Sequence, residues 1–192
     1  RLAERYNLLY FDLENGFETL LKLPQEWKDR IELVSIPDTK VYPVAIETIL
    51  KVLEGKVSIC EKHGKCSCIR CKKEPDAEYV VVDINNLSKD VIVVIDSLTQ
   101  LSNSAMNLLT AEHEDEYKPD WGDYRNQGQL MDKVLSQIQQ ARYNIVCITH
   151  VVETEFEDGR KKLVPLAGTP NFSRNSAKYF DHVVYCEVKN KK

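Results

Sequence analysis

Short apolar runs alternate with amphipathic segments along the chain, and this alternation predicts a mixed α/β domain. Continuous apolar runs of strand length are typical of strands buried on both faces of a parallel sheet. Strand patterns occupy residues 8–11, 31–36, 79–84, 91–95, 144–148 and 182–188. Apolar residues at helical spacing predict helices over 44–53, 98–109 and 130–143, and a helical turn or two over 173–180. Strands that alternate with helices favour one mostly parallel sheet with right-handed crossovers.

Three stretches depart from this rhythm. Residues 57–86 hold four of the six cysteines, residues 113–125 are acidic and rich in turn-forming residues, and residues 151–171 are polar. The last of these is interpreted as a loop or a splayed hairpin. We therefore expect one domain over residues 1–192, with a small Cys-rich insert at 57–86.

Composition narrows the class of protein. With 192 residues, 43% of them hydrophobic, the chain can bury one core of ordinary domain size. Hydrophobic runs do not reach the length of a membrane span, and the first residues do not read as a signal peptide. The net charge of −4 argues against a protein that binds nucleic acid over most of its surface, but it permits a local basic loop. A reducing cytoplasm is the expected location, with cysteines as thiols or metal ligands.

Polar side chains follow three of the predicted strands. Asp12 and Glu14 follow the first, Asp96 and Ser97 follow the strand at 91–95, and Thr149 and His150 follow the strand at 144–148. The carboxyl ends of parallel strands meet at one edge of a sheet, where ligands collect. A carboxylate followed by a hydroxyl suits a magnesium ion held near phosphates. The alternative is structural, because an apolar strand that ends in Asp is common.

The motifs resemble those of RecA-like P-loop ATPases. Residues 8–16 (LLYFDLENG) are similar to the strand that carries the catalytic glutamate of that family, and residues 91–101 (VIVVIDSLTQL) are similar to its Walker B strand. Residues 145–150 (IVCITH) are similar to the following sensor strand. The order of the motifs, with WGDY at 121–124, resembles phage ATPases linked to single-strand annealing and recombination.

This resemblance implies roles for residues at the strand ends. Glu14 polarises the attacking water, Asp96 and Ser97 hold Mg²⁺, and His150 senses the γ-phosphate of ATP. Asp12 and Thr149 line the same nucleotide site. The terminal lysines Lys189 and Lys191 resemble residues that reach across a subunit interface, although a charged, frayed chain end explains them equally.

One element of the family is missing from these residues. No G-x-x-x-x-G-K-[ST] sequence, which supplies the phosphate-binding loop, occurs among the 192 residues. In the family that loop precedes the strand of Asp12, so we expect it upstream of Arg1. We also expect the 192 residues alone to be inactive.

The resemblance further implies contact with single-stranded DNA from the loop after the sensor strand. The basic residues there are Arg160, Lys161, Lys162 and Arg174, with Phe156 and Phe172 as groups that could stack on bases. A solvated hairpin turn is the alternative interpretation. Trp121 and Tyr124 fit packing of the acidic loop better than stacking on bases.

Four cysteines cluster within the insert. Cys60, Cys66, Cys68 and Cys71 could hold a structural Zn²⁺, and His63 is an alternative ligand. The competing interpretation is an exposed loop that binds no metal or forms disulfides after purification. Cys147 and Cys186 lie in predicted strands and are expected in the core.

These observations favour a phage-type ATPase of recombination or annealing. It uses ATP and Mg²⁺, assembles into a ring or filament on single-stranded DNA, and works beside a single-strand-binding protein in the cytoplasm of a bacterial host. The alternatives are a RecA-fold helicase or helicase loader, and a non-catalytic DNA-binding scaffold without a P-loop.

Overall fold

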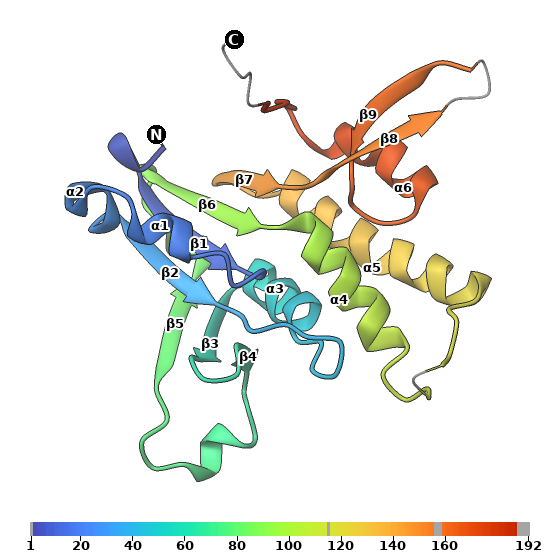
Figure 1. Ribbon diagram of the computed structural model, residues 1–192. Helices are drawn as coiled ribbons and strands as arrows, with labels where there is room; N and C mark the ends of the chain where they lie inside the picture. The colour runs from blue at the N-terminus through green and yellow to red at the C-terminus, as the bar shows by residue number, and fades with distance from the viewer. Residues whose placement is uncertain (1, 115, 156–158, 188–192) are drawn as a thin grey trace.

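A four-stranded parallel sheet forms the centre of the computed structural model, which describes residues 2–114, 116–155 and 159–187 (Figure 1). The strand order across this sheet is β2-β1-β6-β7. The strands are β1 (Asn7–Asp12), β2 (Ile31–Ser35), β6 (Val91–Asp96) and β7 (Asn144–Ile148). All three pairings between them are parallel, which confirms the predicted α/β class with a parallel central sheet.

Three helices cover one face of the central sheet. They are α3 (Ala45–Glu54), α4 (Leu98–Leu109) and α5 (Trp121–Gln139). Because side chains alternate along a strand, Leu9 and Phe11 of β1 point into the main core with these helices, whereas Leu8 joins a smaller cluster on the other face. That smaller cluster contains Ala3 and Trp27. Among the described residues, no helix is both long enough and apolar enough to cross a bilayer.

Short helices complete the domain. The α-helices are α1 (Glu18–Leu21), α2 (Gln25–Lys28) and α6 (Pro170–Asn175). The 3-10 helices are Leu2–Glu4, Cys71–Lys73, Ile84–Asn86 and Ser176–Tyr179. The two elements at 170–179 match the helical turns expected at 173–180.

The insert forms a second, antiparallel sheet of order β4-β3-β5. Its strands are β3 (Lys56–Cys60), β4 (Lys65–Cys66) and β5 (Tyr79–Asp83). One face of this sheet joins the main core through Ile59, Cys66 and Val82. The loop between β4 and β5, which carries Cys68 and Cys71, extends away from the central sheet (Figure 1).

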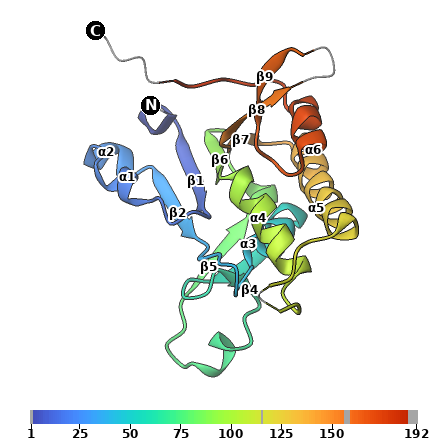
Figure 2. The same cartoon turned by 45° about the vertical axis from the view of Figure 1, so that its right-hand side comes forward.

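The polar stretch at residues 151–171 contains a β-hairpin, which was one of the two structures predicted for it, the other being a loop. Its strands are β8 (Val151–Glu155) and β9 (Lys161–Pro165), which pair in antiparallel register. The hairpin and the Cys-rich loop lie at opposite ends of the molecule (Figure 1, Figure 2). If the hairpin and the Cys-rich loop both bind ligands, they do so on two separate surfaces of the protein.

Helix α5 starts nine residues earlier than the sequence pattern predicted, at Trp121 instead of Leu130. A capping box begins it: the Asp120 carboxylate accepts from the Asp123 backbone N–H, and the Asp123 carboxylate accepts from the Asp120 N–H. The buried face of the first turns includes Gln127, whose amide donates to the backbone of Ser102. Since a polar side chain fills this core position, hydrophobic periodicity did not reveal the helix.

The prediction of a strand at 182–188 is wrong for residues 182–187, which the structure describes. Residues 182–187 form no strand, and Val183, Val184 and Tyr185 are exposed. A strand is stable only where a neighbour pairs its N–H and C=O groups, and the described chain offers none there. Cys186 is consequently exposed and not in the core, whereas Cys147 of β7 is half-buried against it.

Candidate functional site

The three polar strand ends meet at one edge of the central sheet. In the register of the sheet, Asp12 of β1 is the partner of Asp96 of β6, and Asp96 is the partner of Ile148 of β7. Parallel pairing therefore brings the residues that follow each strand together, as expected for the carboxyl edge of an open sheet. The contacts among them define a strand-end site of Glu14, Asp96, Ser97, Thr149 and His150.

Asp12 is fully buried and organises the loop that carries Glu14. One carboxylate oxygen accepts from the backbone N–H groups of Glu14 and Gly16 at 3.1 Å each, and the other accepts from Phe17 at 3.1 Å. Asn15 in this loop takes a positive φ of 56°, which asparagine tolerates better than most residues. Asp12 thus uses its charge to hold the loop. Asp12 is predicted to line the nucleotide site, and in the structure its carboxylate contacts the backbone of the loop that carries Glu14.

Glu14 bridges the other two strand ends. Its carboxylate accepts a short hydrogen bond from the Ser97 hydroxyl, and its second oxygen lies 3.7 Å from Nε2 of His150. The Glu14 side chain is 30% exposed, so solvent or a ligand can reach it. Ser97 also caps α4 by accepting from the Gln100 N–H at 3.1 Å. Glu14 is accordingly held by two polar neighbours while it keeps contact with solvent.

Asp96 is half-buried and is held by a tyrosine from the neighbouring strand. The Tyr10 hydroxyl donates a short hydrogen bond to its carboxylate. Burial raises the pKa of Asp96 above its usual range, and the Tyr10 hydrogen bond opposes that rise. Nearby Glu14 and Asp12 raise the pKa further, whereas His150 lowers it. A cation at this edge would relieve the electrostatic cost of these clustered acids.

Thr149 and His150 are tied to α4 and to the base of the hairpin. The Thr149 hydroxyl donates to the backbone carbonyl of Leu166, and the Thr99 hydroxyl reaches the same carbonyl at 2.9 Å. The His150 N–H donates to Thr99 Oγ1 at 3.0 Å, and its carbonyl accepts from the Leu166 N–H at 2.8 Å. The imidazole of His150 stays largely exposed and faces Glu14. A movement of His150 would therefore shift Leu166 at the base of the hairpin, because the two residues are joined by a direct hydrogen bond and share the partner Thr99.

Chemically, the strand-end site offers hard oxygen ligands beside a general base. The carboxylate of Asp96 and the hydroxyl of Ser97 are the ligand types that Mg²⁺ accepts beside phosphates. Glu14 stands where it can orient a water molecule, and His150 adds a donor for an anionic group. The arrangement suits hydrolysis of a phosphoanhydride.

Comparison with known proteins identifies the class. The family model described as AAA domain matches residues 2–192, so the chain belongs to this family of AAA-type P-loop ATPases. A family of this class implies nucleotide binding with Mg²⁺. No curated protein and no solved structure was found to match the chain.

The Cys-rich insert contains a compact group of metal-ligand side chains. The ligand atoms of Cys60, His63, Cys68 and Cys71 all lie within 4.8 Å of one another. Cys66, which the sequence analysis placed with the other cysteines, points instead into the main core. Cys66 pairs with Ile59 in the β3–β4 ladder, so it shares the core-facing side with Ile59, while Cys60 faces the opposite side.

The sequence did hold a signal for this ligand set. With His63 in place of Cys66, the spacing becomes C-x2-H followed by C-x2-C, two pairs of the kind that zinc sites use. The sequence alone favours the four cysteines as ligands with His63 as an alternative, and the structure places His63 in the group.

The residues predicted to contact DNA lie on or beside the hairpin. Arg160, Lys161 and Lys162 are exposed at the start of β9, and Lys161 pairs with Glu153 at 3.0 Å. Arg174 of α6 donates to the backbone carbonyl of Glu155 at 2.9 Å. The structure thus gathers these four cations around one hairpin.

The aromatic residues considered for stacking are placed differently. Phe172 is half-buried: it packs against the main core and also lines an open pocket between α5 and α6. Trp121 is 76% exposed at the start of α5, with the Arg125 guanidinium 5.8 Å from its ring centre, which contradicts the packing role predicted for it. Phe156, Lys189 and Lys191 lie outside the described residues.

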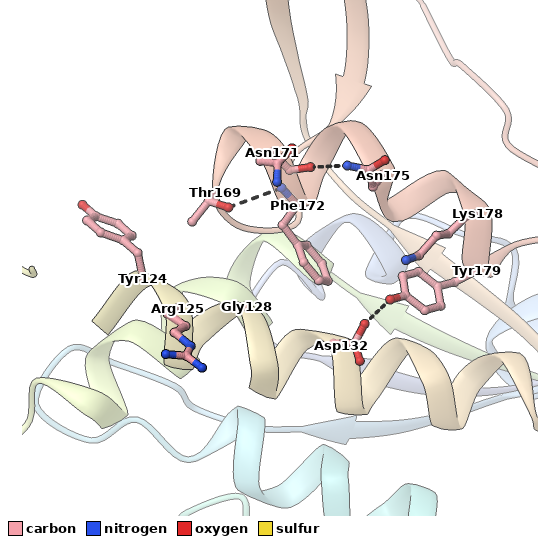
Figure 3. A pocket seen from close by; sticks show the side chains of 10 residues that line it. All are labelled: Tyr124, Arg125, Gly128, Asp132, Thr169, Asn171, Phe172, Asn175, Lys178 and Tyr179. Atoms are coloured by element: carbon pink, nitrogen blue, oxygen red, sulfur yellow. Dashed lines mark hydrogen bonds between the residues drawn. The ribbon is translucent and has the colours of Figure 1, made fainter. Parts of the chain in front are cut away.

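An open pocket of about 330 Å³ lies between α5 and α6, away from the strand ends (Figure 3). Its lining residues are Tyr124, Arg125, Gly128, Asp132, Thr169, Asn171, Phe172, Asn175, Lys178 and Tyr179. The Tyr179 hydroxyl donates to the Asp132 carboxylate across its floor. No residue of the strand-end site lines it.

Proposed function

We propose that the chain is the catalytic core of a RecA-like, DNA-stimulated ATPase of phage type that acts in recombination or annealing. The observation that carries this proposal is the contact of Glu14 with both Ser97 and His150 across three strand ends. Such a constellation fits a water-orienting glutamate beside a magnesium-binding acid and a group that reports the γ-phosphate. The work takes place in the cytoplasm of a bacterial host.

Each residue has a defined task in this proposal. Asp96 and Ser97 hold Mg²⁺, Glu14 orients the attacking water, and His150 contacts the γ-phosphate. Thr149 positions His150 by fixing the backbone at Leu166. A magnesium ion held by Asp96 and Ser97 would neutralise charge on the phosphates.

The hairpin supplies the link from ATP to DNA. His150 is joined through its backbone to Leu166, the residue after β9, so a shift at the γ-phosphate reaches the basic residues of the hairpin. Exposed Arg160, Lys161 and Lys162 suit the phosphates of a single strand. Trp121 with Arg125 offers an exposed ring and a cation that suit an unstacked base. A ring or filament with single-strand-binding protein as a partner is consistent with this arrangement.

The catalytic assignment is tested by Glu14→Gln in ATP hydrolysis by the complete protein. We expect a loss of turnover of about 10²–10⁴-fold, the range of a general base, with nucleotide binding retained. The matched control is Glu18→Gln, an exposed carboxylate in the neighbouring helix α1. Equal turnover by Glu14→Gln and the parent refutes the catalytic role of Glu14, whereas absence of turnover in the parent favours a non-catalytic scaffold.

The DNA assignment is tested separately by binding of single-stranded DNA over a range of salt concentrations. Lys161→Ala with Lys162→Ala should weaken binding and reduce the slope of log K against log[salt] by about 1, given roughly 0.7 per phosphate contact. The control pair is Lys22→Ala with Lys89→Ala, two exposed lysines far from the hairpin in the sequence. If both pairs change the slope equally, the hairpin is not the DNA-binding surface. Strand unwinding by the parent protein would favour a helicase.

A further inference from the structure

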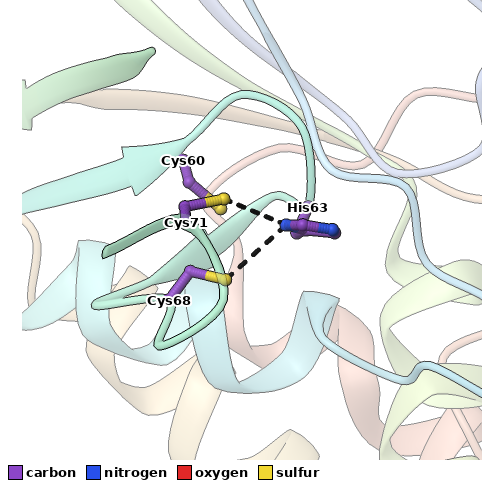
Figure 4. A group of neighbouring side chains, drawn as sticks. All are labelled: Cys60, His63, Cys68 and Cys71. Carbon is purple, nitrogen blue, oxygen red and sulfur yellow. Dashed lines mark hydrogen bonds between the residues drawn. The ribbon is translucent and has the colours of Figure 1, made fainter. Parts of the chain in front are cut away.

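The group of Cys60, His63, Cys68 and Cys71 has the dimensions of an occupied tetrahedral site (Figure 4). Nδ1 of His63 lies 3.1 Å from the Cys71 sulfur and 3.6 Å from the Cys68 sulfur. Bonds of about 2.3 Å to sulfur and 2.0 Å to nitrogen set ligand atoms at roughly 3.5–3.8 Å from one another around tetrahedral zinc. The two distances from Nδ1 lie on either side of the value for a nitrogen–sulfur pair, and the four side chains point toward one centre (Figure 4).

The backbone around these ligands is shaped for metal binding. Gly64 and Ser67 take positive φ values of 59° and 54°, which turns the chain sharply between the two ligand pairs. The Lys72 N–H donates to the Cys68 carbonyl at 3.1 Å and the Glu74 N–H donates to the Cys71 carbonyl at 3.0 Å, which fixes the turn that carries this ligand pair. His63 uses Nδ1 toward the sulfurs, which leaves Nε2 for an outer partner.

Apolar packing does not account for the order of this loop. Cys60, Cys68 and Cys71 form a buried cluster of their own, and the one partly buried hydrophobic residue packed against it is Ala77. The neighbouring Ile69 is 73% exposed. A segment with so little apolar burial needs another source of stability, and a structural metal is the usual one.

The turn at His63 and Gly64 packs closely against Ile36 and Pro37, which follow strand β2 of the central sheet. A Cβ added to Gly64 would lie 2.7 Å from the Cα of Ile36 and 2.8 Å from Cδ of Pro37, so the two backbones are in close contact. The Thr48 hydroxyl of α3 donates to the Gly64 carbonyl at 2.8 Å. Next to this contact, the Ile36 N–H donates to the Asp12 carbonyl at 2.9 Å.

We propose that Cys60, His63, Cys68 and Cys71 bind one Zn²⁺ ion, and that this ion holds the His63–Gly64 turn against Ile36 and so supports the loop of Asp12 and Glu14. Three thiolates and one imidazole are a ligand set that zinc prefers, and all four positions are filled, so the site is structural and not catalytic. Cys66 is not a ligand, because the β3–β4 pairing turns it into the core. The proposal does not depend on ATP hydrolysis.

Metal content of the complete chain tests the ligand set. After purification in reducing buffer, we expect about one zinc per chain by elemental analysis, and Co²⁺ in its place should show the absorption of tetrahedral thiolate coordination. Cys68→Ser and Cys71→Ser should lose at least about tenfold in zinc affinity, whereas the control Cys66→Ala should keep the parent value. His63→Cys should retain zinc, which guards against loss through misfolding alone. A chain that is folded, reduced and free of zinc after reconstitution overturns the proposal, as does loss of zinc in Cys66→Ala with retention in Cys68→Ser.

Amide hydrogen exchange tests the structural link. On removal of zinc by a chelator, the amides of Ile36 and of residues 14–17 should exchange at least about tenfold faster, while the amides of β6 should keep their rates. Re-addition of Zn²⁺ should restore the slow exchange. If zinc is bound but its removal leaves the amides of Ile36 and 14–17 unchanged, the ion does not support the Glu14 loop and that part of the proposal is wrong.

Discussion

Replacement of Asp12 by alanine should destabilise the protein and disable the loop of Glu14. The carboxylate is fully buried and accepts three backbone hydrogen bonds, two on one oxygen and one on the other. A hydrogen bond to a charged group contributes roughly 1.5–3 kcal/mol net. The N–H groups that it binds belong to exposed residues, so water replaces part of the loss in the variant.

We therefore expect the free energy of unfolding to fall by about 3 kcal/mol in Asp12→Ala, which is less than three full hydrogen bonds to a charged group would give, because water replaces part of the loss. Asp12→Asn should lose about half as much, because one oxygen still accepts from Glu14 and Gly16 while the new amide faces the Phe17 N–H. With a urea m-value of about 1–3 kcal/mol/M, the alanine variant should unfold at a midpoint lower by roughly 1–3 M.

Urea unfolding followed by circular dichroism measures this effect, and ATP hydrolysis by the full-length protein follows its consequence. A displaced Glu14 should slow hydrolysis by about 10²-fold even in folded protein. The matched control is Asp29→Ala, whose exposed carboxylate accepts from the Gln25 side chain, and it should shift the midpoint little. An Asp12→Ala midpoint equal to that of the control would refute the reasoning from buried hydrogen bonds.

Three further perturbations follow from the same contacts. Tyr10→Phe removes the hydroxyl that lowers the pKa of Asp96, so Mg²⁺ binding by the variant should fall further below that of the parent as the pH is lowered; a ratio of the two affinities that does not change with pH would contradict this. Asp96→Asn should raise the melting temperature of the metal-free protein at pH 7 but not at pH 4. Burial raises the pKa of Asp96 in the folded state, so the stability that the protonated acid contributes is lost as the pH rises through that pKa. An equal gain in melting temperature at both pH values would argue against a raised pKa of Asp96. Gly64→Ala should cost about 2–4 kcal/mol in urea unfolding, because the added carbon meets backbone and the positive φ disfavours alanine. Its control, Gly128→Ala, adds a methyl group into open space on a helix and should be neutral or stabilising, so similar losses in both variants would count against the contact.

The start of α5 at Trp121 was not predicted from the hydrophobic periodicity of the sequence. The sequence of Asp120 and Asp123 contains the spacing of a capping box, which was available without a structure. The following turns bury Gln127 and carry Gly128, so a search for apolar periodicity passes over them. A hydrogen bond from Gln127 to Ser102 of α4 makes that polar position acceptable in the core, and this partner is distant in the sequence.

The strand-end site could be anticipated because its chemistry is local. Each of the three strands is an apolar run with its polar residues directly after it, so the carboxyl edge follows from the α/β pattern alone. The sequence did not distinguish Asp12 from Asp96, since both follow a strand. Burial decides the difference: Asp12 is enclosed and bound to backbone, whereas Asp96 is half-buried and accepts from the Tyr10 hydroxyl.

By itself the sequence determined the α/β class, the main strands, the helices α3 and α4, and the residues that collect at the carboxyl edge. These follow from periodicity and from residue type, which act over a few residues. Only the tertiary structure decided that Cys66 enters the core while His63 joins the metal-ligand group, and that residues 182–187 are not a strand. Those outcomes depend on which face of β3 a side chain takes and on whether a partner strand is present, and both are set by contacts between segments far apart in the chain.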